Sequence, residues 1–350
     1  MKLLLPVAGK SSRYPGIRPK WLLTMPNGQL MIERSLEGLN LNFIKEVVII
    51  MLKEHTKFIT PELLKKIISK YTGEIPVNIF LLDDETPSQP STISKYLKNS
   101  KEDFKFFIKD CDNFFKFKPK PANCVSYVSL DNIEIVAAGS KSYITMNNFD
   151  EIELIIEKKV ISENFCCGGY GFESSKDFLK IYEEIGGDLN SDLYISHIIQ
   201  KKLLDGSTFH GYEAFGYEDY GTVTEFKNYI KNVRSIFCDF DGVLVENSSK
   251  FASPPWQYNP MVKNLNYLSD FLKNSPYSKL IITTSRPNEE KENIINFLKR
   301  YNIELHSLVT DLPHAGRILV NDFSNSNPFP TAQGINIPRN CDNLKDYFSS

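Results

Sequence analysis

The hydrophobic residues of the first 230 or so positions fall into short apolar runs, separated by longer stretches with helical spacing. Runs of this length read as buried strands. We predict strands at residues 3–7, 47–51, 77–82 and 104–108. Helices are predicted over residues 30–39 and after Thr60, where Pro61 suits the first helical position. Strands that alternate with helices predict an α/β fold with a layered sheet.

The first apolar run ends in a turn of small residues that reads Ala-Gly-Lys-Ser-Ser-Arg over residues 8–13. Backbone N–H groups in such a turn can approach phosphate oxygens closely. Arg13 and Lys20 add positive charge within a few residues. The turn therefore fits a nucleoside triphosphate, although an ordinary loop with two solvated cations is the alternative. The residues expected at the nucleotide are Gly9, Ser11, Ser12, Arg13 and Lys20.

Two carboxylates, Asp110 and Asp112, follow directly after the predicted strand at residues 104–108. Open α/β sheets place ligands and metals just beyond the carboxyl ends of their strands. Mg²⁺ prefers one or two carboxylates together with phosphate oxygens. We therefore expect Mg²⁺ here, the alternative being an acidic loop that merely faces solvent.

The pattern restarts after a short charged connector at residues 227–233, which predicts domains at 1–230 and 231–350. A run at 235–238 ends in Asp239-Phe240-Asp241-Gly242. Two carboxylates in this spacing can bind Mg²⁺ and present one oxygen as a nucleophile. Later runs at 280–283 and 317–320 predict two more strands, which lead to Thr284 and Asp322.

Composition and charge narrow the class of protein. A net charge of −2 and a pI near 6.3 argue against a nucleic-acid-binding protein. The apolar start is too short for a signal peptide, and no run reaches the ~18 apolar residues of a membrane span. The six cysteines form no C-x-x-C pattern, so reduced thiols in a cytoplasm are expected.

The first domain resembles the sugar-1-phosphate nucleotidyltransferases. Pro19-Lys20 after the small-residue turn matches their signature loop, with Ser11 in place of the second glycine. Asp110-x-Asp112 is similar to their metal-binding motif. Residues 86–92 resemble the segment that reads the base, with Gln89 as the amide contact.

The resemblance continues to about residue 229. Glu157-Lys158 is similar to the pair that holds sugar hydroxyls and the sugar phosphate, and Gly168 lies in a stretch like the glycine-rich strand beneath the sugar. Residues 217–222 resemble a late motif in which Asp219 is the second metal carboxylate. The resemblance implies a Rossmann-like mixed sheet of the GT-A type, with Mg²⁺ on Asp110, Asp112 and Asp219.

The second domain resembles the haloacid dehalogenase superfamily of phosphohydrolases. The resemblance implies Asp239 as nucleophile, Asp241 as general acid and then base, and Thr284 as a phosphoryl contact. Asp322 would complete the metal site with Asp239 and Asp241. The superfamily's phosphate-binding lysine has no clear counterpart, and Arg317 and His314 are the candidates to replace it. The short stretch between Asp239 and Thr284 leaves no room for a large cap, so a capless Rossmannoid fold is expected.

Together these patterns predict a bifunctional enzyme. The first domain would transfer a nucleotidyl group to a sugar or polyol phosphate. A pyrimidine nucleotide is expected because Gln89 offers a donor and an acceptor and the loop at 86–92 has no feature tied to a purine; CTP is the first choice, with UTP and dTTP as alternatives. The second would hydrolyse a phosphate monoester. The fusion resembles enzymes of bacterial capsule biosynthesis. The alternatives are a sugar-nucleotide sensor, a phosphatase with a non-catalytic first domain, and a nucleotidyltransferase with a degenerate second domain. No nucleic-acid or membrane partner is expected, and a homo-oligomer is left open.

Overall fold

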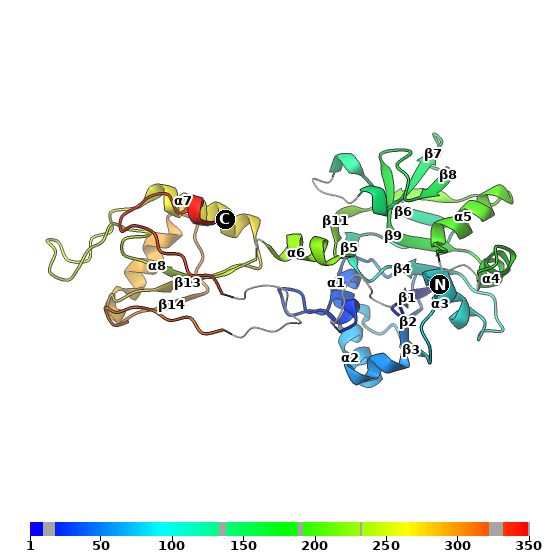
Figure 1. Ribbon diagram of the computed structural model, residues 1–350, viewed down its shortest axis with the longest axis horizontal. Coiled ribbons are helices and arrows are strands. Elements are labelled where there is room, and N and C mark those ends of the chain that lie inside the picture. The colour runs from blue at the N-terminus through cyan, green and yellow to red at the C-terminus, as the bar shows by residue number, and fades with distance from the viewer. Residues whose placement is uncertain (10–17, 133–137, 188–191, 232, 322–331, 349–350) are drawn as a thin grey trace. The chain divides into compact units, whose positions relative to one another are not determined.

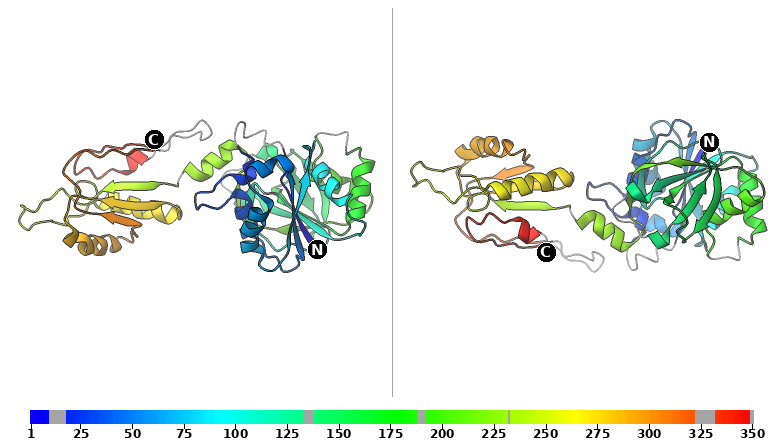
Figure 2. Two further views of the ribbon diagram at one scale, coloured as in Figure 1. Left: turned by 90° about the horizontal axis from the view of Figure 1, so that it is seen from below. Right: turned by 90° about the horizontal axis from the view of Figure 1, so that it is seen from above.

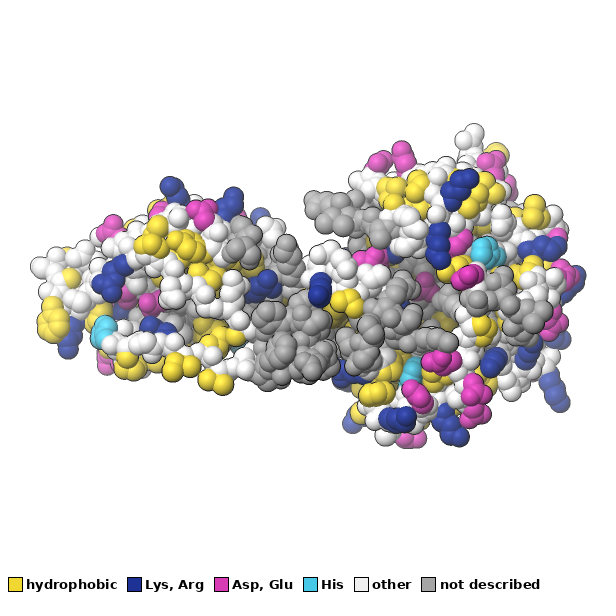
Figure 3. Space-filling view, in the orientation of Figure 1, with side chains coloured by type: hydrophobic (Ala, Val, Ile, Leu, Met, Phe, Trp, Pro, Cys, Tyr) yellow, Lys and Arg dark blue, Asp and Glu magenta, His cyan; other side chains and the backbone are white. Residues whose placement is uncertain are grey.

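A computed structural model describes residues 1–9, 18–132, 138–187, 192–231, 233–321 and 332–348 (Figure 1). The chain divides into two compact units, Met1–Tyr229 and Ile230–Ser350. None of the helices in these ranges is long and apolar enough to cross a membrane. On the face that Figure 3 shows, positive and negative side chains are interspersed, as expected for a net charge of −2.

The first unit is built on a nine-stranded mixed sheet, whose main path runs β10-β6-β9-β4-β1-β2-β3. β1 pairs in parallel with β2 and β4, whereas β9 runs antiparallel to β4 and β6. β7 pairs with β8 and β9 at one side of this path. The strands are β1 (Lys2–Pro6), β2 (Glu46–Leu52), β3 (Val77–Leu82), β4 (Phe106–Lys109), β6 (Cys124–Ser129), β7 (Ser142–Met146), β8 (Ile152–Glu157), β9 (Asn164–Phe172) and β10 (His210–Glu213).

Helices cover both faces of this sheet, and the strands and helices can be followed by colour in Figure 2. One core takes Leu3 and Leu5 of β1, and the other takes Leu4. Successive side chains of a strand point to opposite faces, so a strand buried on both faces needs a continuous apolar run. This is why the runs at 3–7 and 47–51 predicted strands correctly. The run at 77–82 also forms a strand, β3, which lies at the edge of the sheet and has Asn78 and Leu81 exposed. The helices are α1 (Met31–Glu37), α2 (Pro61–Thr72), α3 (Gln89–Leu97), α4 (Ser175–Glu184) and α5 (Ile195–Leu204).

The helix predicted after Thr60 is confirmed as α2. The Thr60 hydroxyl accepts a hydrogen bond from the backbone N–H of Leu63, at 3.2 Å, and Pro61 occupies the first turn. The helix predicted at 30–39 is confirmed as α1.

A separate ribbon of two antiparallel strands, β5 (Asn113–Lys116) and β11 (Phe215–Asp219), lies beside the sheet. Helix α6 (Val223–Lys231) follows β11. The predicted connector at 227–233 is therefore wrong in its first part. Val223, Phe226 and Tyr229 recur at helical spacing and pack on the cluster around buried Tyr220, which favours a helix over a loop.

The second unit has a parallel sheet of three strands in the order β12-β13-β14. The strands are β12 (Ser235–Asp239), β13 (Lys279–Thr283) and β14 (Ser307–Val309), and the helices are α7 (Val262–Asn274), α8 (Lys291–Lys299) and α9 (Lys345–Phe348). Its core is formed by residues such as Leu265, Leu280 and Ile294.

The strand predicted at 317–320 is wrong. This segment pairs with no strand among the described residues, and the side chains of Ile318 and Val320 are 90% and 87% exposed. The strand beside β13 is β14, although its sequence, Ser-Leu-Val, is a weaker apolar run. Pairing with a neighbour, rather than local hydrophobicity, decides which segment becomes a strand.

Candidate active site

A buried lysine at the end of β4 holds the loop that follows this strand through hydrogen bonds. Lys109 is fully buried, and its ammonium donates to the backbone oxygens of Asp110 and Asn113 and to the side-chain oxygen of Asn113. Burial lowers the pKa of Lys109. The three acceptors satisfy the ammonium completely and hold the turn that carries Asp112. Lys109 could not be predicted from the sequence, because a lysine at a strand end gives no signal of burial.

Asp112 and Asp219 come together at one end of the β5–β11 ribbon. Asp219 pairs with Asn113 across the ribbon, and the backbone N–H of Tyr220 donates to the backbone oxygen of Asp112 at 2.8 Å. A Cβ atom on Gly221 would lie 3.5 Å from Oδ2 of Asp112 and 3.1 Å from Oδ1 of Asp219. The two carboxylates therefore face one point.

Each of these carboxylates also forms an ion pair with a lysine. Lys20 pairs with Asp112, and Lys141 pairs with Asp219. No cluster of three or more metal-ligating side chains occurs in the part of the chain that the structure describes. Two carboxylates facing one point fit Mg²⁺ that takes its other ligands from water and phosphate.

Asp110 has a different partner from Asp112. The Gln89 amide donates to Oδ1 of Asp110, so the structure places Gln89 against this carboxylate. Burial, together with the neighbouring Asp112 carboxylate, raises the pKa of Asp110 to about 6. Gly168, with φ of +93°, lies directly beneath, and a Cβ atom there would be 2.5 Å from Oδ2 of Asp110.

Glu157 and Lys158 lie at the end of β8. The hydroxyls of Ser142 and Ser196 both donate to Oε2 of Glu157, the second at 2.7 Å. The Lys158 ammonium is exposed and donates to the Tyr194 hydroxyl. Gly9 is exposed at the end of β1. The predicted nucleotide contacts Ser11, Ser12 and Arg13 lie outside the described residues.

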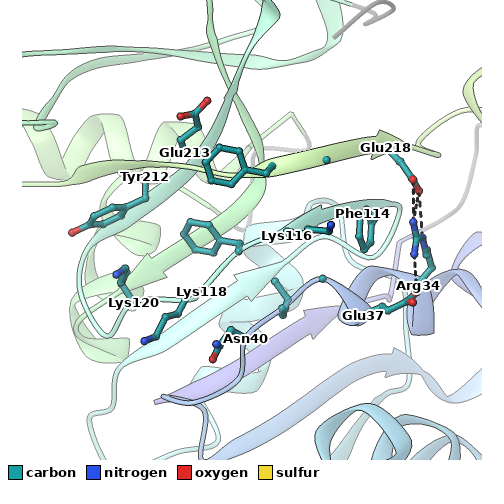
Figure 4. A pocket seen from close by; sticks show the side chains of 15 residues that line it. Arg34, Glu37, Asn40, Phe114, Lys116, Lys118, Lys120, Tyr212, Glu213 and Glu218 are labelled. Atoms are coloured by element: carbon teal, nitrogen blue, oxygen red, sulfur yellow. Dashed lines mark hydrogen bonds and ion pairs between the residues drawn. The ribbon is translucent and has the colours of Figure 1, made fainter. Parts of the chain in front are cut away.

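A cavity of about 1090 Å³ lies against the ribbon and α1 (Figure 4). Its walls include Phe114 and Glu218, whose neighbours in sequence are Asn113 and Asp219. Side chains of adjacent strand residues point to opposite sides, so Asp219 and this cavity, which Glu218 lines, lie on opposite faces of the ribbon. Arg34 spans Glu218 and Glu37 at its edge, as the dashed lines in Figure 4 show.

In the second unit, Asp241 is held by a fully buried arginine. The Arg286 guanidinium donates to Oδ1 of Asp241 at 2.8 Å and to Oδ2 at 3.0 Å, and it also reaches the backbone oxygens of Trp256 and Gln257. The Thr284 hydroxyl lies 3.4 Å from Oδ2 of Asp241. The role of Arg286 could not be predicted from the sequence, because only the fold brings this residue to Asp241.

Asp239 ends β12 and lies 3.4 Å from the Arg317 guanidinium. Burial raises the pKa of Asp239, which the positive charge of Arg317 partly offsets. His314 instead contacts the Ser285 hydroxyl, at 3.3 Å. Of the two candidates for the missing phosphate-binding lysine, Arg317 is therefore the one beside Asp239. Asp322 lies outside the described residues.

No protein-family model matches the chain, and no curated protein matches it. The chain does match solved structures. A nucleoside-diphosphate-sugar pyrophosphorylase from Vibrio cholerae RC9 is 18% identical, with a TM-score of 0.54 over 65% of this chain and 99% of its own. A putative glucose-1-phosphate thymidylyltransferase from Bacillus anthracis is 20% identical, with a TM-score of 0.50 over 65% of this chain and 92% of its own.

Over the matched 65% of its length, this chain shares the fold of these two structures. The central mixed sheet expected from the sequence is present. The matched share of 65% equals the size of the first unit, 229 of 350 residues.

Proposed function

We propose that the first unit transfers a nucleotidyl group from a nucleoside triphosphate to a sugar or polyol phosphate and releases pyrophosphate. The observation that carries this proposal is the approach of Asp112 and Asp219 to one point, beside Lys20. The fold shared with nucleotidyltransferases supports it.

The reaction needs positioning and charge neutralisation more than proton transfer. An oxygen of the acceptor phosphate, already ionised at neutral pH, forms a bond to the α-phosphorus. The bond from that phosphorus to the bridging oxygen breaks, and its electron pair leaves with pyrophosphate. Preorganised cations around the phosphates supply such stabilisation.

Specific residues are assigned to each task. Asp112 and Asp219 would hold Mg²⁺, which neutralises phosphate charge when bound, and Asp110 would add a third carboxylate beside them. Gly9, Ser11, Ser12, Arg13 and Lys20 would bind the triphosphate, and Gln89 the base. Glu157 would bind sugar hydroxyls, Lys158 the sugar phosphate, and Gly168 would leave room beneath the sugar.

We propose that the second unit is a capless phosphohydrolase of the haloacid dehalogenase type, in which the side chains of Asp239 and Asp322 and the backbone oxygen of Asp241 would hold Mg²⁺, so that the Asp241 carboxyl can carry a proton. An Asp239 oxygen attacks the phosphorus, and the leaving alkoxide takes a proton from Asp241. Asp241 then accepts a proton from the water that cleaves the aspartyl phosphate. Arg286 holds Asp241 in place, Thr284 contacts the phosphoryl group, and Arg317 supplies positive charge beside Asp239.

The two reactions would serve a cytoplasmic pathway to an activated precursor of a surface polysaccharide, such as a capsule. CTP is the favoured nucleotide. The domains assigned to the two activities are 1–230 and 231–350.

The test is pyrophosphate release from CTP, UTP, dTTP, ATP and GTP, each with a panel of sugar and polyol phosphates. We expect Asp112→Asn to lower turnover by about 10²–10³. Asp205→Asn, which removes an exposed carboxylate from a surface pair with Lys201, is the matched control and should leave turnover unchanged. Near-normal turnover in Asp112→Asn would show that the metal lies elsewhere.

A further inference from the structure

Lys141 lies immediately before β7 and has no role in the reaction assigned above. Its ammonium pairs with Asp219, and both side chains are largely buried, with 15% and 13% exposed. The ammonium also donates to the Tyr217 hydroxyl at 3.0 Å. A largely buried ammonium needs a negatively charged partner, because burial removes the charge from water. Here that partner is a carboxylate proposed to bind the metal.

The hydrogen bonds of Asp219 show which of its oxygen atoms are already occupied by donors and so are less available to a metal ion. Oδ1 accepts from the backbone N–H of Gly221 at 2.9 Å. Oδ2 accepts from both Lys141 and the Tyr217 hydroxyl, the latter at 3.1 Å. Two donors use both lone pairs of this oxygen. A divalent cation that bound through Oδ2, or through both oxygens of Asp219, would therefore have to displace Lys141, whereas a cation bound through Oδ1 alone would leave Lys141 in place.

The backbone of Lys141 connects the carboxylates to the proposed sugar-phosphate site. Its carbonyl oxygen accepts from the N–H of Lys158 at 2.9 Å, and the next residue, Ser142, donates to Glu157. Lys141 thus stands between Asp219 and the Glu157-Lys158 pair. An ammonium displaced from Asp219 would therefore belong to a residue whose backbone adjoins the proposed acceptor site.

We propose that Lys141 binds phosphate in the transfer site. When the metal binds Asp219, the Lys141 ammonium leaves this carboxylate and binds the phosphates of the substrates. The inference rests on the proposed nucleotidyl transfer. In each of two ion pairs, one ammonium charge is neutralised by one carboxylate charge; the pairs are Lys20–Asp112 and Lys141–Asp219. Arrival of a divalent cation leaves the Lys141 ammonium without its carboxylate, and substrate phosphates are the anions that the reaction brings.

The test compares Lys141→Met and Lys141→Arg in the full-length protein, with Lys159→Met, an exposed neighbouring lysine, as control. Mn²⁺ binding is measured first without substrate, from the electron paramagnetic resonance of free Mn²⁺. We expect Lys141→Met to bind Mn²⁺ about tenfold more tightly, because its competitor is gone. Its kcat/KM for the acceptor should fall by about 10²–10³. Lys141→Arg should keep wild-type Mn²⁺ affinity and most of the turnover.

Tighter metal binding together with slower turnover is a combination that a merely structural lysine would not produce. Mn²⁺ binding by Lys141→Met that is no tighter than wild type would overturn the displacement, and an unchanged kcat/KM would overturn phosphate binding. Should Lys141→Met fail to fold, Lys141→Gln replaces it with the same two expectations. Failure of the wild type to release pyrophosphate from any nucleotide would overturn the proposed function, whereas the Mn²⁺ comparison needs no substrate and would still decide the displacement.

Discussion

At the scale of single residues, Gly168 shows how closely β9 packs beneath the carboxylate loop. Gly168 and Gly28 both adopt positive φ, +93° and +86°. A Cβ atom at Gly168 would meet Asp110 and Asn113 within 2.7 Å, whereas nothing lies within 4 Å of one at Gly28. A substitution at Gly28 therefore tests backbone strain alone, whereas the same substitution at Gly168 adds a steric clash.

We predict that Gly28→Ala costs about 1–2 kcal/mol of unfolding free energy, from the backbone alone. Gly168→Ala should cost more, and it should also lower pyrophosphate release, because Asp110 must move. Urea unfolding and the pyrophosphate assay measure the two effects. Equal losses of stability in the two variants, with full activity in Gly168→Ala, would contradict the packing argument.

His55 makes the stability of the first unit depend on pH. The ring is 4% exposed, lies 5.7 Å from the ring of Trp21, and burial lowers its pKa. The unfolded chain then binds a proton more readily than the folded one. The contribution of His55 to stability is therefore constant above the unfolded pKa, about 6.5, and is lost as the pH falls below it.

We predict that wild-type protein loses more stability than His55→Phe when the pH is lowered from about 7 to about 5. Phe keeps an aromatic ring against Trp21 but cannot take up a proton. Urea unfolding of both proteins across this range, with metal removed, measures the difference. Parallel stability curves would show that His55 is protonated as easily in the folded state as in the unfolded one.

At the scale of elements, the start of α3 contributes directly to the site, because the first residue of this helix contacts a site carboxylate. The Ser88 hydroxyl caps α3 by accepting from the N–H of Ser91 at 3.3 Å, and the first residue of the helix is Gln89, which reaches Asp110. Thr60 caps α2 in the same way. No polar contact of α2 with the site carboxylates is present among the described residues, so Thr60 is a matched control.

We predict that Ser88→Ala and Thr60→Ala each cost about 1 kcal/mol of unfolding free energy, because each removes an N-cap. Only Ser88→Ala should also raise the KM for the nucleotide. Urea unfolding and steady-state kinetics distinguish the variants. If Thr60→Ala raised the nucleotide KM equally, the change would reflect general loosening of the unit.

At the scale of the whole molecule, the two units have separate cores and separate carboxylate pairs. We predict that Asp239→Asn abolishes phosphomonoester hydrolysis and leaves nucleotidyl transfer unchanged, because an amide is a poor nucleophile. Phosphate release from a panel of phosphate esters and pyrophosphate release from nucleotides measure the two activities on one preparation. The absence of Mg²⁺-dependent phosphate release from the wild type would contradict the bifunctional reading.

The sequence by itself determined the features that depend on neighbouring residues. Continuous apolar runs identified β1 and β2, because strands buried on both faces leave no polar positions. The run that identified β3 is mostly apolar, although this edge strand carries Asn78 and is only partly buried. Thr60-Pro61 marked the start of α2, because a cap and a fixed φ act locally. Asp112 was named because it follows a buried strand, where open α/β sheets place their ligands.

Tertiary structure decided whatever depends on segments far apart in the chain. The three residues at 307–309 became a strand and the apolar 317–320 did not, because only the former pairs with β13. Residues after 223 became α6 because Tyr220 offered a surface for a helix. Lys141 on Asp219 and Arg286 on Asp241 were not foreseen, because a charged side chain carries no local signal of its partner, and the partner is chosen by which strand ends the fold brings together.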